Sequence, residues 1–272
     1  MKDPFYNNGI GMISAKLEQP AFPAPKQSAN TLFNFMPRKD YLKKILTNMA
    51  IIPRYVNENI NYLGLSTDNL AIPMTCFCDI NMQRIKWHTK RYGRYGIAFH
   101  KDWSIRKGIQ PIHYINPESF ILREYRETFI DAEKYSGDDP EIERLQDYLL
   151  CHLAFMKPLY SDMSSSAKQN FHDEREWRYV PNMADISSEL PQILWGKKNS
   201  AKARRDFNDG LVQCKAGWLS FKCDDVRYIL LPDEKALQSI VKYIRSLKSV
   251  SEDEKYLLCS KLICLNSLEE DI

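Results

Sequence analysis

The sequence predicts an α+β fold with an antiparallel-rich central sheet, a helical insertion at about residues 130–160, and helices near the C-terminal end. Short β-favouring runs alternate irregularly with helical patterns, and no regular succession of strand, helix and strand points to a doubly wound parallel sheet. The chain has 272 residues, of which 44% are hydrophobic and 27% are charged, as in ordinary globular proteins. We expect residues 31–272 to form a single domain that follows an N-terminal arm over residues 1–30, where four prolines break any periodicity.

The first part of this domain reads as a strand, a turn and a helix. The run TLFNFM favours a strand, and Pro37 marks the turn. The segment DYLKKILTNM places its apolar residues on one helical stripe, with Asp40 available as the N-cap. After Pro53 the chain is expected to return toward the core.

Two further strands flank a basic aromatic segment. LAIPMTCFCDI is apolar enough for a buried strand, and IAFHKDW reads as another, followed by IQPIHYIN. Between them lies RIKWHTKRYGRYG, which we interpret as a loop because Gly93 and Gly96 indicate tight turns.

The strongest helix signal begins at Asp139, which stands before Pro140 as N-cap and N1 of an apolar stripe that continues to Met156. A polar loop, SDMSSSAKQNF, and a strand in DEREWRYVP come next. KAGWLSFKCDDVRYILLPDE predicts two more strands. Helices are then expected over about residues 233–266, the last of them opening with the capping box of Ser251 and Glu254.

Charge and cysteine content restrict the function. The net charge of +3 does not by itself indicate a nucleic-acid or membrane-surface protein, and neither a membrane helix nor a secretory signal is predicted, so we expect a cytoplasmic protein without a membrane partner. Seven cysteines at irregular spacings predict reduced thiols. Cys76 and Cys78 with His88 would be the best metal ligands, but two small buried side chains are the simpler interpretation, and we expect no metal site.

No GxGxxG, GxxxxGK[ST], HExxH, GxSxG or CxxC motif occurs in the sequence, which argues against nucleotide triphosphatases and zincins. A candidate site must therefore combine separated segments. Three motifs stand out: FCDI at residues 77–80, YGRYGI at residues 92–97 and EREWR at residues 174–178. In these motifs the chain resembles the AbiGi family of abortive-infection phage-resistance proteins, and the resemblance extends over about residues 31–233. It implies an antitoxin partner of a nucleotidyltransferase toxin.

A looser resemblance, in the order of the motifs, is to NAD-dependent ADP-ribosyltransferases. It implies a catalytic Glu176 that stabilises the ribosyl cation and a Glu174 that orients the ribose or the acceptor. Further roles follow from the same resemblance: Tyr92 or Tyr95 would stack the nicotinamide of NAD, Asn34 would stand at the first motif, and Arg38 or Arg54 would hold the pyrophosphate. Most such enzymes have His or Arg at the first motif, followed by Ser or Thr, and a site that binds a nucleotide without turnover is compatible with the same residues.

Three alternatives for the carboxylates stay open. On a strand, Glu174, Glu176 and Arg178 would share one face, where the arginine could simply neutralise a solvated surface. The chain could be a non-catalytic antitoxin or regulatory partner that binds a toxin, a nucleotide or a nucleic acid. A metal-dependent nuclease using Asp173 with both glutamates is the third interpretation. The sequence therefore leaves open whether the chain is an enzyme.

The basic aromatic segment predicts contact with nucleic acid, because its cations alternate with rings that can stack on bases. A solvated basic loop beside a core tryptophan is the plainer interpretation. The predicted contact residues are Lys86, Trp87, His88, Lys90, Arg91 and Arg94. A second basic loop follows at residues 197–205.

Overall fold

The computed structural model describes residues 29–161 and 169–270, so the predicted N-terminal arm and most of the polar loop near residue 165 lie outside the described residues. Within the described ranges, nine strands form one sheet whose main path runs β13-β12-β5-β1-β4-β9-β6, while β3 and β10 also pair with β4. Every pairing in this sheet is antiparallel except that of β12 with β13, which confirms the α+β prediction. The strands are β1 (Thr31–Met36), β3 (Arg54–Asn59), β4 (Asn69–Cys78), β5 (Tyr95–His100), β6 (Gln110–Pro111), β9 (Glu176–Tyr179), β10 (Leu194–Trp195), β12 (Val226–Leu231) and β13 (Leu262–Cys264).

Two small two-stranded sheets complete the β-structure of the described ranges. The antiparallel one pairs β2 (Ala50–Ile51) with β11 (Leu219–Ser220). The parallel one pairs β7 (His113–Ile115) with β8 (Met156–Pro158). Strand β8 follows helix α5 directly, and β7 follows β6, which pairs with β9. The β7–β8 pair therefore holds the end of the helical insertion close to β9.

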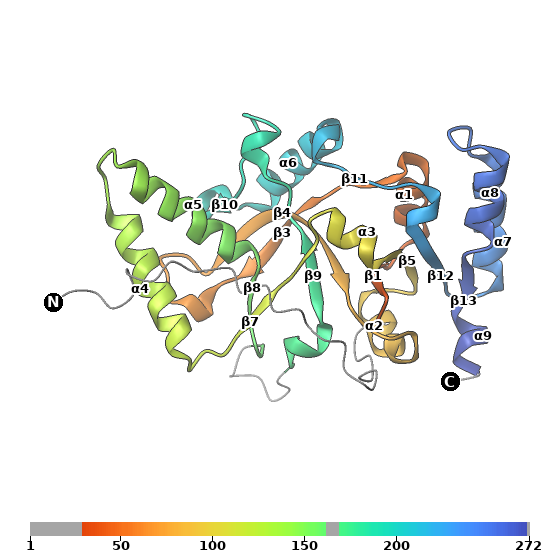
Figure 1. Ribbon diagram of the computed structural model, residues 1–272, viewed down its shortest axis with the longest axis horizontal. Coiled ribbons are helices and arrows are strands. Elements are labelled where there is room, and N and C mark those ends of the chain that lie inside the picture. The colour runs from red at the N-terminus through yellow and green to blue at the C-terminus, as the bar shows by residue number, and fades with distance from the viewer. Residues whose placement is uncertain (1–28, 162–168, 271–272) are drawn as a thin grey trace, which may run out of the picture.

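Helices cover both faces of the central sheet, as Figure 1 shows. On one face lie α1 (Lys39–Asn48), α3 (Lys101–Arg106), α7 (Glu234–Ser246) and α8 (Glu252–Cys259), whose apolar stripes form the largest core with β5 and β12. Helix α6 (Ala201–Gln213) packs on the same face, over β3 and β4.

The opposite face carries α2 (Ile85–Tyr92), α4 (Phe120–Lys134), α5 (Pro140–Ala154) and α9 (Leu265–Glu270). Helices α4 and α5 lie antiparallel at one end of the molecule, while α7, α8 and α9 lie at the other end (Figure 1). Alternate side chains of β4 enter different cores because they point to opposite faces: Phe77 packs in the core of α1 and α7, whereas Ile72 and Met74 pack against α4 and α5.

The predicted caps were correct for two helices. Asp139 caps α5, where its side chain accepts a hydrogen bond from the backbone N–H of Glu141. Ser251 and Glu254 form the predicted capping box of α8. For α1 the prediction was wrong, since Arg38 occupies the N-cap position and Asp40 already lies in the first turn. There the negative charge of Asp40 interacts favourably with the positive end of the helix dipole.

Three further elements differ from expectation. The basic aromatic segment is helix α2 and not a loop, because its buried residues Ile85, His88 and Thr89 recur at helical spacing. Helix α4 was not predicted, and the helical insertion therefore begins near residue 120 instead of 130. The C-terminal helices α7 and α8 lead into the parallel strand β13, a crossover that the sequence did not reveal.

Among the described residues, no helix is both long and apolar enough to span a membrane.

Candidate functional site

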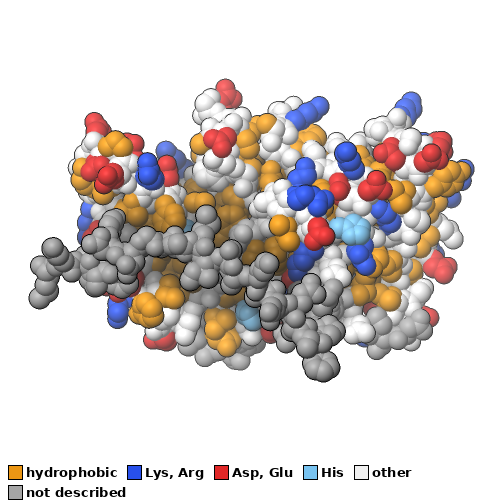
Figure 2. Space-filling model, viewed as in Figure 1, with side chains coloured by type: hydrophobic (Ala, Val, Ile, Leu, Met, Phe, Trp, Pro, Cys, Tyr) orange, Lys and Arg blue, Asp and Glu red, His pale blue; other side chains and the backbone are white. Residues whose placement is uncertain are grey.

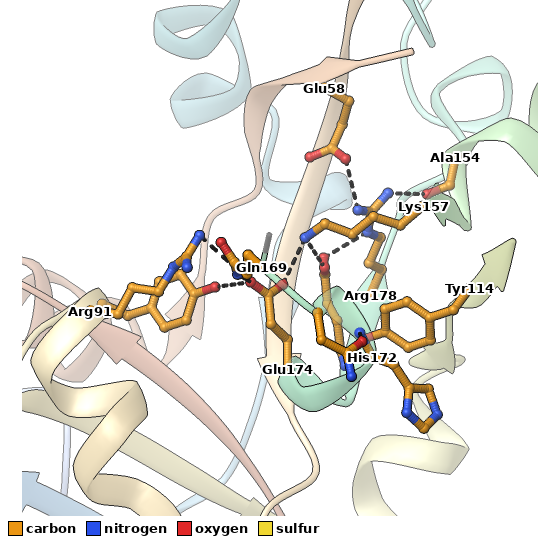
Figure 3. A network of polar contacts seen from close by, with 12 residues as sticks. Glu58, Arg91, Tyr114, Ala154, Lys157, Gln169, His172, Glu174 and Arg178 are labelled. Atoms are coloured by element: carbon orange, nitrogen blue, oxygen red, sulfur yellow. Dashed lines mark hydrogen bonds and ion pairs between the residues drawn. The ribbon is translucent and has the colours of Figure 1, made fainter. Parts of the chain in front are cut away.

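The EREWR motif lies where five elements meet: β9, β3, β8, α2 and the 3-10 turn Phe171–Glu174. Strand β9 pairs with β4, so Glu176 stands opposite Cys78 and Arg178 stands opposite Cys76. Side chains of paired residues share a face, and the glutamate and the arginine therefore point toward the α4–α5 side of the sheet. Figure 3 shows the polar network that results.

Glu174 belongs to the same network but lies outside strand β9. It ends the 3-10 turn before β9, so the prediction that Glu174 and Glu176 lie on one strand was wrong. Between them Arg175 adopts a left-handed conformation with φ of 45°. This turn points two carboxylates to one side although only the second belongs to the strand.

Both carboxylate oxygens of Glu176 are occupied. One accepts from Arg178 Nε at 2.7 Å, and the other accepts from Lys157 Nζ at 2.9 Å. Burial alone would raise the pKa of Glu176, but Arg178 and Lys157 more than offset it, so the pKa falls from 4.5 to about 2. Glu176 is therefore a carboxylate at neutral pH, held by two cations.

Glu174 is also enclosed, with its side chain only 4% exposed. One oxygen accepts from the Tyr92 hydroxyl at 2.5 Å and from Gln169 Nε2 at 2.6 Å, while the other accepts from Lys157 Nζ at 2.8 Å. Lys157 thus joins the two glutamates, and the two carboxylates keep its pKa above the ordinary lysine value against the opposing effect of burial. The half-exposed Arg91 lies 3.8 Å from the same glutamate.

Arg178 is fully buried and extends the network to β3. Its guanidinium donates to Glu58 at 2.9 Å and to the backbone oxygen of Ala154, the last residue of α5, at 2.7 Å. Three carboxylates, of Glu58, Glu174 and Glu176, thus face two inner cations and Arg91 at the edge. Their charges are nearly balanced, which a buried ionic cluster requires.

Neutral groups surround the ions. Burial, and next the charge of Glu176, raises the pKa of the Cys76 and Cys78 thiols, so both are protonated at neutral pH. The backbone N–H of Glu176 donates to the Tyr114 hydroxyl at 2.7 Å. Burial, followed by the hydrogen bond to Glu174, raises the pKa of Tyr92, which therefore acts as a donor.

The residues predicted for the NAD site fall into two groups. Tyr92, Glu174 and Glu176 do come together. Asn34 and Tyr95 lie on the opposite face of the sheet: Phe33 pairs with Cys78 and shares the face of Glu176, so the next residue points away, and Tyr95 packs against the α1–α7 core. Asn34 donates to the backbone oxygen of Cys76 at 2.9 Å.

The two arginines predicted to hold a pyrophosphate are exposed and separate from the network. Arg38 stands at the N-cap position of α1, on the other face, and pairs with Asp40 at 3.2 Å. Arg54 begins β3, four residues before Glu58. Neither is bonded to the glutamates, so the structure assembles only part of the predicted constellation.

Lys157, Glu58, Gln169 and Tyr114 are the network residues that sequence reasoning missed. They are separated from the EREWR motif by 5 to 120 positions along the chain, and no local spacing connects them to it. Lys157 in FMKPLY had one weak signal, since a lysine among apolar residues is rarely buried unless it is paired with an acidic group.

The residues predicted to contact nucleic acid are divided by helix α2 into an exposed and a buried set. Lys86, Trp87, Lys90 and Arg91 are exposed, and the guanidinium of Arg91 lies 5.5 Å from the Trp87 ring centre. His88 points inward, and burial lowers its pKa. Arg94 follows the helix and pairs with Glu269 of α9 at 3.0 Å.

Two cavities of about 360 and 170 Å³ lie away from the carboxylates. The larger one is lined by α4, α5 and the residues around β10, and the smaller one by the start of β1 and by Arg227 with Tyr228. Over residues 29–161 and 169–270, no group of three or more His, Cys, Asp or Glu side chains is arranged to hold a metal ion.

Comparison with known proteins gives a consistent family assignment. Residues 49–232 match the family model described as "Putative abortive phage resistance protein AbiGi, antitoxin". The chain is also similar to the abortive phage resistance protein AbiGi of Lactococcus lactis subsp. cremoris, with 32% identity over 250 residues, which cover 82% of this chain and 100% of that protein. No solved structure matches the chain. The family model spans more than half of the sequence, and the match to the relative, at 32% identity, covers that protein's full length, so the chain belongs to the AbiGi family.

Proposed function

We propose that this protein is a non-catalytic antitoxin of an abortive-infection system against phage, and that it acts by binding a toxin protein. The family description names an antitoxin, and the relative is named for abortive phage resistance. The single observation that carries the non-catalytic part is the state of Glu176, whose two oxygens are both used by cations of the fold.

A carboxylate that stabilises a ribosyl cation must face the sugar from a cleft. Glu176 faces Arg178 and Lys157 instead, and it is only 6% exposed. Turning it toward a substrate would break two charge-assisted hydrogen bonds and leave Arg178 short of a partner in the interior, at a cost of about 3–5 kcal/mol. The arrangement therefore suits a rigid support for a binding surface better than a reacting centre.

Complex formation with the product of the neighbouring gene tests this proposal. The two proteins are expressed together, with an affinity tag on one of them, and analysed by size-exclusion chromatography. We expect one stoichiometric complex that survives a high-salt wash. If the neighbouring product elutes apart from the tagged protein under all conditions, the antitoxin proposal is wrong.

An ADP-ribosyltransferase-like activity on NAD, with a protein or nucleic-acid acceptor, is the second candidate. It is favoured by the convergence of Tyr92, Glu174 and Glu176, and in particular by the 2.5 Å hydrogen bond between the first two. In that mechanism Glu176 would stabilise the cation, Glu174 would orient the ribose and Tyr92 would stack the nicotinamide. The ADP-ribosyltransferase-like fold stays a prediction here.

Nicotinamide release separates the two candidates. The protein is incubated with NAD and with protein, DNA or RNA acceptors, and free nicotinamide is quantified. The antitoxin proposal predicts no release above buffer. Release by the wild type that Glu176→Gln abolishes would instead favour the transferase.

Nucleic-acid binding through α2 remains a proposal supported by the exposed Lys86, Trp87 and Lys90. Fluorescence anisotropy with labelled single-stranded RNA and double-stranded DNA tests it. Binding should weaken with rising salt and with the double substitution Lys86→Glu and Lys90→Glu. An unchanged affinity in that variant would exclude α2 as the contact surface.

A further inference from the structure

We propose that the groove between α4, α5 and β10 is the docking site for a basic segment of the partner protein that inserts one large apolar side chain. The inference rests on the proposed function, because it names the surface and the chemistry through which a protein partner is held. It places the contact at the opposite end of the sheet from α7, α8 and α9 (Figure 1).

The groove contains a cavity of about 360 Å³, the volume of a small ligand or of a few buried side chains. Its walls are mainly apolar, and Phe129 of α4 stacks on Trp195 with ring centres 5.9 Å apart. Figure 2 shows hydrophobic side chains gathered in the hollow between the α4–α5 end and the central part of the molecule. The lining residues are Phe129, Ala132, Glu133, Gln146, Leu149, Leu150, Ile193 and Trp195.

Hydrogen bonds between α4 and α5 hold the walls of the hollow. Gln146 Nε2 donates to the backbone oxygen of Ala132 at 2.7 Å and thereby joins the two helices across the groove. The Tyr125 hydroxyl donates to the backbone oxygen of Leu149 at 2.6 Å, about two turns earlier on α4 and one turn later on α5. A preformed apolar cavity of this kind favours an anchor side chain, since little ordering is required on binding.

Charge indicates the kind of partner. Residues 116–155, which include both helices, contain ten acidic and four basic side chains, a formal charge of −6 in a chain whose total is +3. Glu133 lies on the wall of the groove, and Glu143 and Asp147 are exposed on the same helix as Leu150. An acidic rim attracts a basic segment and repels nucleic acid.

Exposed aromatic and aliphatic side chains are frequent on the same two helices. Phe120 is 67% exposed, Ile121 55% and Tyr148 56%, and Tyr135 follows α4 at 44%. Large apolar groups on a polar, charged surface are characteristic of protein interfaces, whose centres are rich in aromatic anchors. None of these four side chains lines the cavity, and the groove and the charge carry the inference: they fit a protein partner with a basic, amphipathic contact segment.

Two synthetic helical peptides serve as probes. Both carry leucines and one tryptophan on one face, while the other face carries lysines in the first peptide and glutamates in the second. We expect the full-length protein to bind the lysine peptide at least tenfold more tightly than the glutamate peptide. Hydrogen–deuterium exchange should show protection by the lysine peptide at residues 129–133, 146–150 and 193–195.

Three variants test the location. Glu133→Lys should weaken lysine-peptide binding about fivefold, as expected for reversal of one charge at an interface rim. Leu150→Gln should weaken it more strongly, and its melting temperature shows whether it is folded. Glu127→Lys is the matched control for Glu133→Lys, because Glu127 is exposed on the same helix, α4, but does not line the cavity. We expect nearly wild-type affinity for this control.

Any one of four results would overturn the docking site. The two peptides could bind equally, or neither could bind. Protection could be confined to other regions, or the Glu127→Lys and Glu133→Lys variants could lose affinity equally. The proposed function fails separately. If the neighbouring gene product binds the wild type and the Glu133→Lys and Leu150→Gln variants alike, the protein is still a partner of that product, and the groove is not the contact.

Discussion

Glu176 combines deep burial with full ionisation, and this makes the stability of the protein sensitive to acid. Its pKa is about 2 in the folded protein and 4.5 without the fold, so the folded state binds fewer protons between these values. Its contribution is fully present above about pH 5.5 and is lost as the pH falls through the folded pKa. The shift corresponds to a free energy of unfolding of about 3 kcal/mol.

The first prediction concerns acid unfolding. We expect the urea midpoint of the wild type to fall between pH 5 and pH 3, because the unfolded chain then binds a proton at Glu176 that the folded protein, in which Arg178 and Lys157 keep the carboxylate ionised, does not bind. Urea titrations followed by tryptophan fluorescence at several pH values measure this fall. In Glu176→Gln the fall should be smaller, and an identical pH profile would show that the carboxylate is not coupled to folding.

The second prediction is the cost of removing one buried charge. Glu176→Gln leaves Arg178 and Lys157 with one carboxylate fewer, and should lower the free energy of unfolding by about 3–5 kcal/mol. Asp173→Asn is the control, since Asp173 directly precedes the same motif but is exposed, and it should change stability by about 0.5 kcal/mol at most. Chemical denaturation at pH 7 gives both values. Similar stability of the two variants would mean that the network contributes little to the fold.

The sequence allowed only part of this network to be predicted. Alternation along a strand correctly placed Glu176 and Arg178 on one face with Trp177 on the other. It could not show that the polar face is the more buried one, because that depends on helix α5 and on Lys157 from β8. Such partners come from long-range pairing, for which a single sequence carries no local signal.

At the scale of elements, the turn before β9 determines where the side chains of the EREWR motif point. Arg175 at φ 45° is a non-glycine residue in the left-handed region, a conformation that costs on the order of 1 kcal/mol for a residue with a Cβ atom. The same turn places Glu174 beside Tyr92 and Lys157. The left-handed backbone of Arg175 therefore places Glu174 in the network at a local conformational cost.

Comparison of two substitutions at this turn isolates the strain. Both Arg175→Gly and Arg175→Ala remove the arginine side chain, but only glycine relieves the backbone. We expect the glycine variant to be the more stable of the two by about 1 kcal/mol. Thermal or chemical denaturation compares them, and an alanine variant of equal or greater stability would contradict a strained turn.

Predictability differed among the helices for physical reasons. Helices α5 and α8 begin with strong capping residues, and their prediction was correct. Helix α4 also has a serine cap at Ser119, but its aromatic and β-branched content favours strand as much as helix, so the pattern was ambiguous. In α2 the glycines that follow the helix dominated the interpretation, although Gly93 only ends it.

At the scale of the whole molecule, one face of the sheet carries two different surfaces at separate positions. The exposed side of α2 is basic and aromatic, whereas the α4–α5 end is acidic and contains the apolar groove. The small net charge of +3 conceals this division. Composition therefore argued correctly against a uniformly basic protein, but only the fold shows which charges lie together.

The antiparallel-rich sheet was predictable from strand patterns, whereas its topology was not. The parallel pairs β12–β13 and β7–β8 are closed by helices of the C-terminal region and of the insertion, and their register depends on packing of those helices. The same insertion buries the EREWR motif. Family membership and burial of the motif thus support the proposed account, in which the carboxylates of the motif stabilise the fold and the surface binds a toxin.

Growth of bacteria that express the neighbouring gene product tests this account most directly. The product alone should arrest growth, and co-expression of the wild-type chain should restore it, while expression of this chain alone should leave growth unchanged. Growth arrest caused by this chain itself, or its failure to restore growth when both proteins are present at comparable levels, would contradict the antitoxin role.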